Sequence, residues 1–222
     1  VLNKAKSDPK RIALAEGTDG KMIRAAHQLS EQGIAEPVLL GDEDTIARTV
    51  SELGLSFRPE VVDPNDRDVS AYGEQLHELR KRKGVTRGEA DQLVSRDTNY
   101  LASAMVKAGD VDAMLTGLTH HYPSALRPPL EVVGSAAETD TVAGVYMLTF
   151  RDRVVFCADT TVTQDPDAET LAEITRHTAT LARRFNVEPR AAVLSYSDFG
   201  SVDNERTRTP RDAVEILHGD DG

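Results

Sequence analysis

The sequence predicts an α/β fold in two lobes, built on doubly wound and mostly parallel sheets. Short apolar runs alternate with amphipathic helical stretches from the start of the chain. The 222 residues, 39% of them hydrophobic, suffice for one large core or two small ones. Aromatic residues make up only 5% of the chain, so Leu, Val, Ile and Ala must fill the space between helices and sheet.

Two strand-helix units open the chain. The first combines a strand at 11–15 with a helix at 21–32, and the second combines a strand at 37–40 with a helix at 43–53. Consecutive units of this kind favour a parallel sheet that is covered by helices on both faces.

Three consecutive helices are predicted next, at 69–82, 86–95 and 97–108. The middle helix has a recognisable start, because Thr86-Arg87-Gly88-Glu89 matches a capping box, in which the hydroxyl and the carboxylate each accept a backbone N–H. A strand at 113–115 then returns the chain to the sheet.

A boundary between two lobes is expected after this strand. Pro128-Pro129 and Gly134-Ser135 interrupt the periodicity and predict a hinge or domain crossing between them. We therefore assign residues 1–133 to the first lobe and residues 134–222 to the second.

The second lobe is predicted to open with a hairpin formed by 141–150 and 153–158. A long helix follows at 167–185, where apolar residues recur at intervals of three and four. The remaining elements are a strand at 191–194, a polar loop at 195–209 and a helix beginning at 210–217. The chain stops before a strand that this helix would lead to, so we expect the second lobe to be incomplete at its C-terminus.

Composition excludes several functions. The formal net charge of -11 repels nucleic acid, and the few aromatic side chains do not suit base stacking. The bias towards Asp and Arg is typical of halophilic proteins, although an ordinary acidic protein fits equally well. No apolar run approaches the ~20 residues that span a membrane, and residues 1–10 lack a signal-peptide core, so the chain is predicted to be cytoplasmic without a membrane partner.

No metal or nucleotide cofactor is predicted within the chain. The single Cys157 and the adjacent His120-His121 lack the spacing of metal ligands. The motifs of serine hydrolases, P-loop proteins and dinucleotide-binding proteins are missing from the sequence.

One candidate binding loop follows the predicted strand at 191–194. Ser195, Ser197, Gly200 and Ser201 offer hydroxyls and backbone N–H groups to a phosphate or a pantetheine chain at the carboxyl end of that strand. A connecting loop without a binding role is the alternative.

Arg80 and Arg127 are the candidate phosphate ligands, because a guanidinium can donate two parallel hydrogen bonds to phosphate oxygens. Arg80 lies in a basic run, which also fits a solvated helix end that offsets the helix dipole. Arg127 precedes Pro128-Pro129, which provide a rigid mount. Asp159 follows a predicted strand and is read either as a site residue or as a turn cap.

Several segments together resemble the phosphate acetyl/butyryltransferase family in order and spacing, namely RIALAEG (11–17), ELRKRKGVT (78–86), MVKAGDVDAMLTG (105–117) and VLSYS (193–197). The resemblance spans nearly the whole chain. The segments ADTTV (158–162), LAEIT (171–175) and SDFGS (197–201) are most similar to the C-terminal domain of NADP-dependent malic enzymes.

This resemblance implies two α/β lobes of the isocitrate/isopropylmalate dehydrogenase type, with a cleft for coenzyme A and acyl phosphate between them. It also implies a homo-oligomer that associates through the second lobe. Arg80 and Arg127 match the substrate-binding arginines of the family. An enzyme of the isopropylmalate dehydrogenase type itself would need clustered metal-binding aspartates, which the sequence lacks.

The family transfers an acyl group by direct attack of the CoA thiol on the acyl phosphate. Its catalytic Asp, Ser and Arg belong to an Asn-Asp-Leu-Ser-Arg-Gly-like segment that family length places beyond residue 222, so we expect no catalytic residue here and no activity from this chain alone. The first interpretation is a malic enzyme domain that binds acetyl-CoA or CoA as a regulator of malate decarboxylation, with NADP and a divalent metal confined to another domain. The alternative is a fragment of a working phosphate acetyltransferase, which moves acetyl between acetyl phosphate and CoA.

Overall fold

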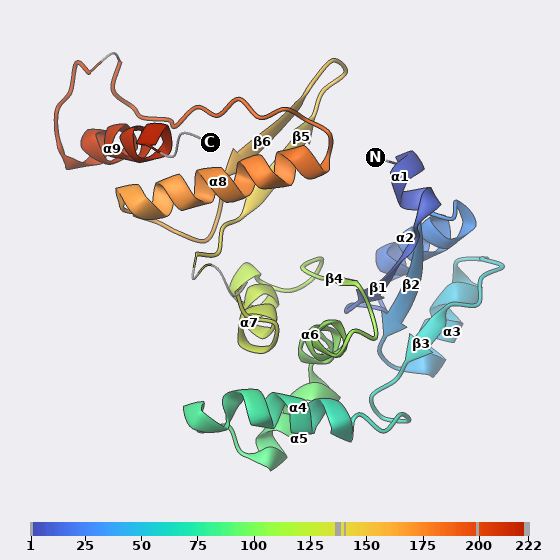
Figure 1. The fold of residues 1–222 in the computed structure, drawn as a ribbon. Helices are drawn as coiled ribbons and strands as arrows, with labels where there is room; N and C mark the ends of the chain where they lie inside the picture. Colours follow the sequence, from blue (N-terminus) through green and yellow to red (C-terminus); the bar gives the residue numbers. More distant parts are fainter. Residues whose placement is uncertain (1, 136–138, 140, 199, 220–222) are drawn as a thin grey trace. The chain divides into compact units, whose positions relative to one another are not determined.

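The computed structural model describes residues 2–135, 139, 141–198 and 200–219. The chain divides into two compact units, Val1–Gly134 and Ser135–Gly222, and each is described by itself. The predicted boundary, between residues 133 and 134, lies one residue earlier. Figure 1 shows the first unit in blue to green and the second in yellow to red.

The first unit contains a four-stranded parallel sheet in the order β3-β2-β1-β4. Its strands are β1 (Lys10–Leu14), β2 (Ala35–Leu40), β3 (Glu60–Val62) and β4 (Ala113–Leu115). β3 was not among the predicted strands. The three residues of β3 are too few for a periodic pattern, and they become a strand by pairing with Val38, Leu39 and Leu40 of β2.

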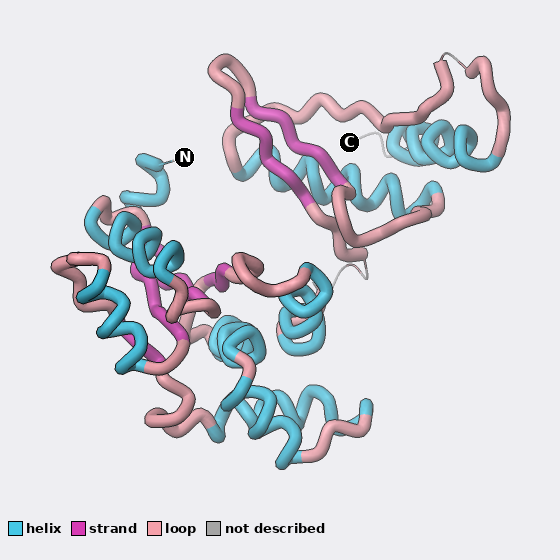
Figure 2. Tube along the Cα trace, turned by 180° about the vertical axis from the view of Figure 1, so that it is seen from behind, coloured by secondary structure: helices cyan, strands magenta, loops and turns pink. Residues whose placement is uncertain are grey.

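Helices cover both faces of this sheet (Figures 1 and 2). The helices of the first unit are α1 (Leu2–Ser7), α2 (Gly20–Glu31), α3 (Glu43–Glu52), α4 (Ser70–Arg80), α5 (Arg87–Arg96), α6 (Thr98–Ala108) and α7 (Tyr122–Val132). Five of them match the predicted ranges within two residues, while α1 and α7 were not anticipated. A short 3-10 turn at Lys81–Lys83 continues α4.

Alternate residues of the strands enter two different cores. Ala13 and Val38 belong to the core that includes residues of α4, α5 and α6. Leu14 and Leu39 belong to the core that includes residues of α2 and α3. All four side chains are 0% exposed, as expected for a parallel sheet that is buried on both faces.

The turn after β1 requires a glycine. A Cβ atom placed on Gly17 would lie 2.6 Å from the carbonyl oxygen of Leu40, which is backbone and cannot move without breaking the sheet edge. The N–H of Gly17 donates to that oxygen at 3.1 Å. Close backbone approach, rather than a positive φ, therefore explains this glycine.

The proline pair lies inside α7, and the predicted crossing between the two units follows that helix, at Gly134–Ser135. Proline has a helix-compatible φ, but it removes a backbone donor and disfavours the helix interior. Packing compensates here, since Ala125, Pro128 and Val132 are buried on one side of the helix. The periodicity is therefore interrupted only after Val132.

The second unit begins with the predicted hairpin (Figure 2). Its strands β5 (Val145–Thr149) and β6 (Val154–Ala158) pair antiparallel, with Met147 opposite Phe156. α8 (Ala168–Arg184) contacts β6, and the ring of Phe156 lies 5.7 Å from that of Phe185 at the end of α8. The parallel arrangement predicted for both lobes is thus found in the first unit, whereas the described sheet of the second is antiparallel.

Two predictions for the end of the chain are wrong. Residues 191–194 form no strand, and Leu194 is 84% exposed. A strand needs a hydrogen-bonded neighbour, and none of the described residues supplies one to this segment. The last helix, α9 (Glu205–Gly219), also starts earlier than expected, because Asn204 and Thr207 hydrogen-bond to each other's backbone N–H and form a helix start.

None of the helices formed by residues 2–135, 139, 141–198 and 200–219 combines the length and the apolarity needed to cross a bilayer.

The capping box of α5 gives a direct stability test. The Thr86 Oγ1 accepts from Glu89 N, and the Glu89 carboxylate accepts from Thr86 N at 2.8 Å. Thr86→Ala should lower the free energy of unfolding by about 1 kcal/mol. Urea denaturation measures this change, and Ser51→Ala on the exposed side of α3 serves as control with no loss expected. An unchanged midpoint for Thr86→Ala would show that the cap contributes nothing.

Candidate functional site

The two predicted arginines meet at one carboxylate. Arg80 is the last residue of α4, and Arg127 and Glu131 lie one turn apart on α7. The Oε1 atom of Glu131 is 3.3 Å from Nη2 of Arg80 and 3.4 Å from Nε of Arg127. We call Arg80, Arg127 and Glu131 the arginine cluster. The structure therefore brings together two residues that the sequence analysis could only name separately.

The other oxygen of Glu131 is held by Tyr100 of α6. The Tyr100 hydroxyl donates to Glu131 Oε2 at 2.6 Å, and the tyrosine is only 6% exposed. Burial, together with the hydrogen bond to the Glu131 carboxylate, raises the pKa of Tyr100 well above its ordinary value. The phenol therefore stays protonated and remains a hydrogen-bond donor across the physiological pH range.

The arginine cluster has the chemistry of an anion site. Two guanidiniums and one carboxylate leave a formal charge of +1 within a chain of net charge -11. Arg127 contacts Glu131 through Nε, and in the described part of the chain its two terminal amines meet no partner. Its side chain is 74% exposed. Terminal amines in this state can donate two parallel hydrogen bonds to a phosphate.

Arg80 is less accessible than Arg127. Its side chain is 26% exposed, and its Nε atom is buried without a hydrogen-bond partner among the described residues. The basic turn Lys81–Lys83 follows it and ends at Gly84, whose φ of 90° lies in the left-handed region that favours glycine. Arg80 ends a helix, where cations are favoured, and it also contacts the Glu131 carboxylate. Its role as a phosphate ligand stays a prediction.

A second carboxylate organises the loop that precedes α7. Glu16, at the carboxyl end of β1, is 7% exposed. It accepts hydrogen bonds from Leu118 N, Thr119 N and Thr119 Oγ1, all at 2.8 Å, and lies 2.7 Å from Nδ1 of His120. Burial acts to raise the pKa of Glu16, but the hydrogen bonds from Thr119, His120 and Leu118 outweigh it and lower the pKa to about 2.

His120 therefore has a structural partner. No group of three or more His, Cys, Asp or Glu side chains that could hold a metal ion occurs in the described ranges. Asp159 likewise acts as a turn cap. Burial acts to raise its pKa, but hydrogen bonds from the N–H groups of Thr161, Thr163, Val162 and Gly144 lower the pKa to about 2.

The predicted serine loop lies in the second unit. Ser195 Oγ accepts from Ser197 N at 3.2 Å, and the Ser197 hydroxyl donates to the carbonyl of Val202 and accepts from its N–H. Gly200 has a φ of 80°, and Ser201 N donates to Asp198 O at 2.9 Å. These contacts order the loop and occupy the Ser197 hydroxyl, while Ser195 and Ser201 are exposed. Phe199 lies outside the described residues.

Sequence reasoning missed Glu131, Tyr100 and Glu16 as site residues. The spacing of Arg127 and Glu131 is the i,i+4 spacing of a helical ion pair, which is a usable signal. The proline pair obscured it, because α7 was not predicted to be helical. No comparable signal existed for Tyr100, which approaches Glu131 only through the packing of α6 against α7.

The Glu16 contacts predict a pH-dependent stability. A carboxyl group whose pKa falls on folding contributes stability above its unfolded pKa, and this is lost as the pH falls from about 4.5 to about 2. Glu16→Gln should cost about 2 kcal/mol at pH 7, because buried donors lose a charged acceptor. The loss in the free energy of unfolding should shrink below pH 4. Glu52→Gln changes an exposed carboxyl group and serves as the control, which should behave as wild type. Denaturant titrations from pH 7 to pH 2.5 measure it, and a pH-independent difference would contradict this account.

Comparison with known proteins identifies the family of the chain. The family model described as phosphate acetyl/butaryl transferase matches residues 1–221. A phosphate acetyltransferase of Clostridium acetobutylicum is 37% identical over 221 residues, which cover 96% of this chain and 66% of that protein. The NADP-dependent malic enzyme of Escherichia coli is 32% identical over 222 residues, which cover 98% of this chain and 29% of that protein.

Solved structures show the same likeness. A phosphotransacetylase from Streptococcus pyogenes matches with a TM-score of 0.90 and 30% identity, over 98% of this chain and 67% of that one. The EutD phosphotransacetylase from Staphylococcus aureus matches with a TM-score of 0.87 and 26% identity, over 98% of this chain and 67% of that one. The sequence match over 221 residues and the shared fold lead to one conclusion: this chain belongs to the phosphate acetyl/butaryl transferase family.

Proposed function

We propose that this chain binds coenzyme A or acetyl-CoA, together with an acyl phosphate, and that Arg80 and Arg127 contact their phosphate groups. One observation carries the proposal: guanidiniums from two helices converge on one carboxylate, while the terminal amines of Arg127 remain without a partner in the described part of the chain. A phosphate group satisfies such amines better than water does. Membership of the family supports these ligands over other phosphates.

We further propose acyl transfer between acetyl phosphate and CoA as the activity of the complete protein. The relatives named phosphate acetyltransferase support it, among them the clostridial protein at 37% identity. The chain spans 66% of the length of that relative. Within the chain, Ser195, Gly200 and Ser201 are proposed to assist through exposed hydroxyls and backbone N–H groups.

A regulatory domain of a malic enzyme is the second candidate. NADP-dependent malic enzymes of Escherichia coli and Rhizobium meliloti are 32% and 35% identical to the chain, which spans 29% of either protein. In this case CoA or acetyl-CoA would act as an effector of malate decarboxylation, and NADP and the metal would be held by another domain. Homo-oligomerisation, a cytoplasmic location and adaptation to high salt stay predictions.

Two assays on the full-length protein separate these candidates. Acetyl-CoA formation from acetyl phosphate and CoA, above a heat-inactivated control, would support acyl transfer. Malate-dependent reduction of NADP that responds to acetyl-CoA, without acetyl-CoA formation, would support the regulatory domain. The absence of both activities, with no binding of CoA, would remove the proposed function.

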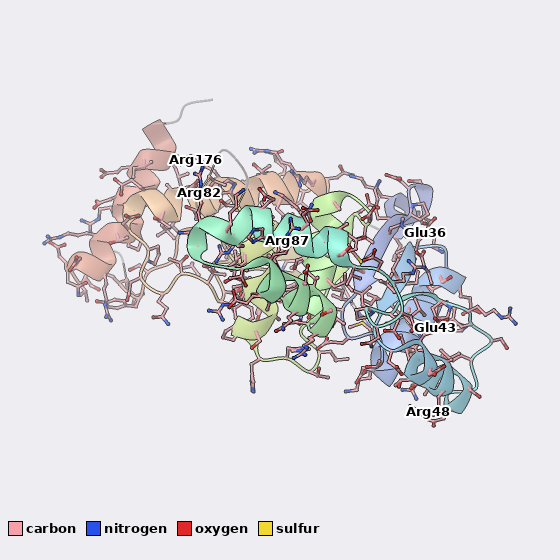
Figure 3. All side chains as sticks on the ribbon, turned by 90° about the horizontal axis from the view of Figure 1, so that it is seen from below. Glu36, Glu43, Arg48, Arg82, Arg87 and Arg176 are labelled. Carbon is pink, nitrogen blue, oxygen red and sulfur yellow. The ribbon has the colours of Figure 1, made fainter. Side chains whose placement is uncertain are left out.

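The arginine cluster makes a specific prediction about affinity. Arg127→Ala should weaken CoA binding by about ten- to a hundredfold, because a charge-assisted phosphate contact contributes roughly 1.5–3 kcal/mol. Isothermal titration calorimetry on the full-length protein measures this. Arg48→Ala on α3 is the matched control and should change affinity little; Figure 3 shows Arg48 on that helix. Equal affinities for wild type and a folded Arg127→Ala variant would place the ligand elsewhere.

A further inference from the structure

We propose that Glu131 is a positioning residue, which Tyr100 holds in place and which presents Arg80 and Arg127 to the ligand as one unit. This inference rests on the proposed function, since it concerns how the same arginines become ready to bind. It adds a role for an acidic residue inside a site for anionic ligands, where a carboxylate would otherwise repel the ligand.

The first step is the division of labour between the two oxygens of Glu131. Oε2 accepts the hydroxyl proton of Tyr100 at 2.6 Å, and Oε1 lies within 3.4 Å of both arginines. Tyr100 belongs to the buried core and cannot move freely. The carboxylate is therefore anchored from the protein interior, and its second oxygen faces the two guanidiniums.

The second step is electrostatic. Two guanidiniums that approach each other repel, and the repulsion grows where water is partly excluded. The Glu131 side chain is 23% exposed and Arg80 is 26% exposed, so the pair is partly shielded from solvent. A shared carboxylate lets both cations converge, and the formal charge that remains is still positive. The arginine cluster can thus attract an anion in spite of its carboxylate.

The third step concerns the orientation of Arg127. Its contact to Glu131 uses Nε, which leaves both terminal amines for a ligand. A side chain that is 74% exposed would otherwise sample many rotamers, and binding would have to order it. Its contact with Glu131 already restricts the Arg127 side chain in the free protein, so less conformational entropy is lost on binding. A phosphate then meets an arginine that is already oriented for two parallel hydrogen bonds.

The experiment measures CoA binding by calorimetry with the full-length protein. Glu131→Gln keeps the side-chain shape and removes the charge, and it should weaken binding about three- to tenfold through the lost ordering. Glu78→Gln is the matched control, because it removes a carboxylate paired with Lys81 on an exposed part of α4. It changes the net charge equally and should leave affinity within about twofold, as expected for an exposed pair.

Coupling between the arginines distinguishes positioning from a general structural role. If Glu131 joins Arg80 and Arg127, their effects on CoA affinity should not be independent. The fold-loss of affinity in the double Arg→Ala variant should then differ from the product of the two single fold-losses by about threefold or more. In the Glu131→Gln background, the fold-loss of the double variant should equal the product of the two single fold-losses to within about 1.5-fold. A residue that only stabilises the fold would lower the melting temperature and leave this coupling unchanged.

The results that would overturn the inference are distinct from those that concern the proposed function. The inference would be overturned by a Glu131→Gln variant that has the melting temperature of wild type and binds CoA as tightly as wild type or more tightly. If Glu131→Gln fails to fold, Tyr100→Phe decides: a two- to fivefold weaker affinity, about the size of one lost hydrogen bond, is expected, and unchanged affinity counts against the inference. An Arg127→Ala variant with wild-type affinity would instead remove the site itself.

Discussion

Burial of both faces of the parallel sheet is the constraint from which the rest of the first unit follows. Ala13 and Leu14 are neighbours in β1, yet they enter separate cores. Each fully buried Leu or Val contributes about 1.5–3 kcal/mol, whereas an exposed ion pair contributes about 0–1 kcal/mol. The apolar cores therefore hold α4, α6 and α7 in place, and the arginine cluster follows from the positions of these helices.

Carboxylates organise the polar parts of a chain whose net charge is -11. Glu16 collects donors from the loop before α7, Asp159 collects four backbone N–H groups, and Glu131 collects a phenol and two guanidiniums. In each case one ionised carboxylate satisfies several hydrogen-bond or ion-pair donors, although three of the four donors to Asp159 are its near neighbours in the chain. Some of the acidic residues therefore have partners within the protein and do not only face solvent. At Glu131 two arginines face one carboxylate, so the local formal charge is positive.

The elements that sequence analysis predicted well are those with long periodic patterns, such as the helices at 20–31 and 168–184 and the hairpin of β5 and β6. Two of the wrong predictions share one cause. Local preference argued against a helix at Pro128-Pro129 and for a strand at 191–194, but burial favoured the helix, and none of the residues that the structure describes pairs with 191–194. Tertiary packing outweighs local propensity when the two differ.

The sequence by itself determined the alternation of strands and helices, the cap of α5 and the two arginines as candidate phosphate ligands, because each depends on residue type and short-range spacing. Only the tertiary structure decided that these arginines share Glu131, that Tyr100 holds it, and that Glu16 binds the loop before α7. The partners Tyr100 and Glu131 are 31 positions apart, and Glu16 and Leu118 are 102 positions apart. No local pattern encodes such contacts, since they arise when helices and strands from distant parts of the chain pack together to bury apolar surface.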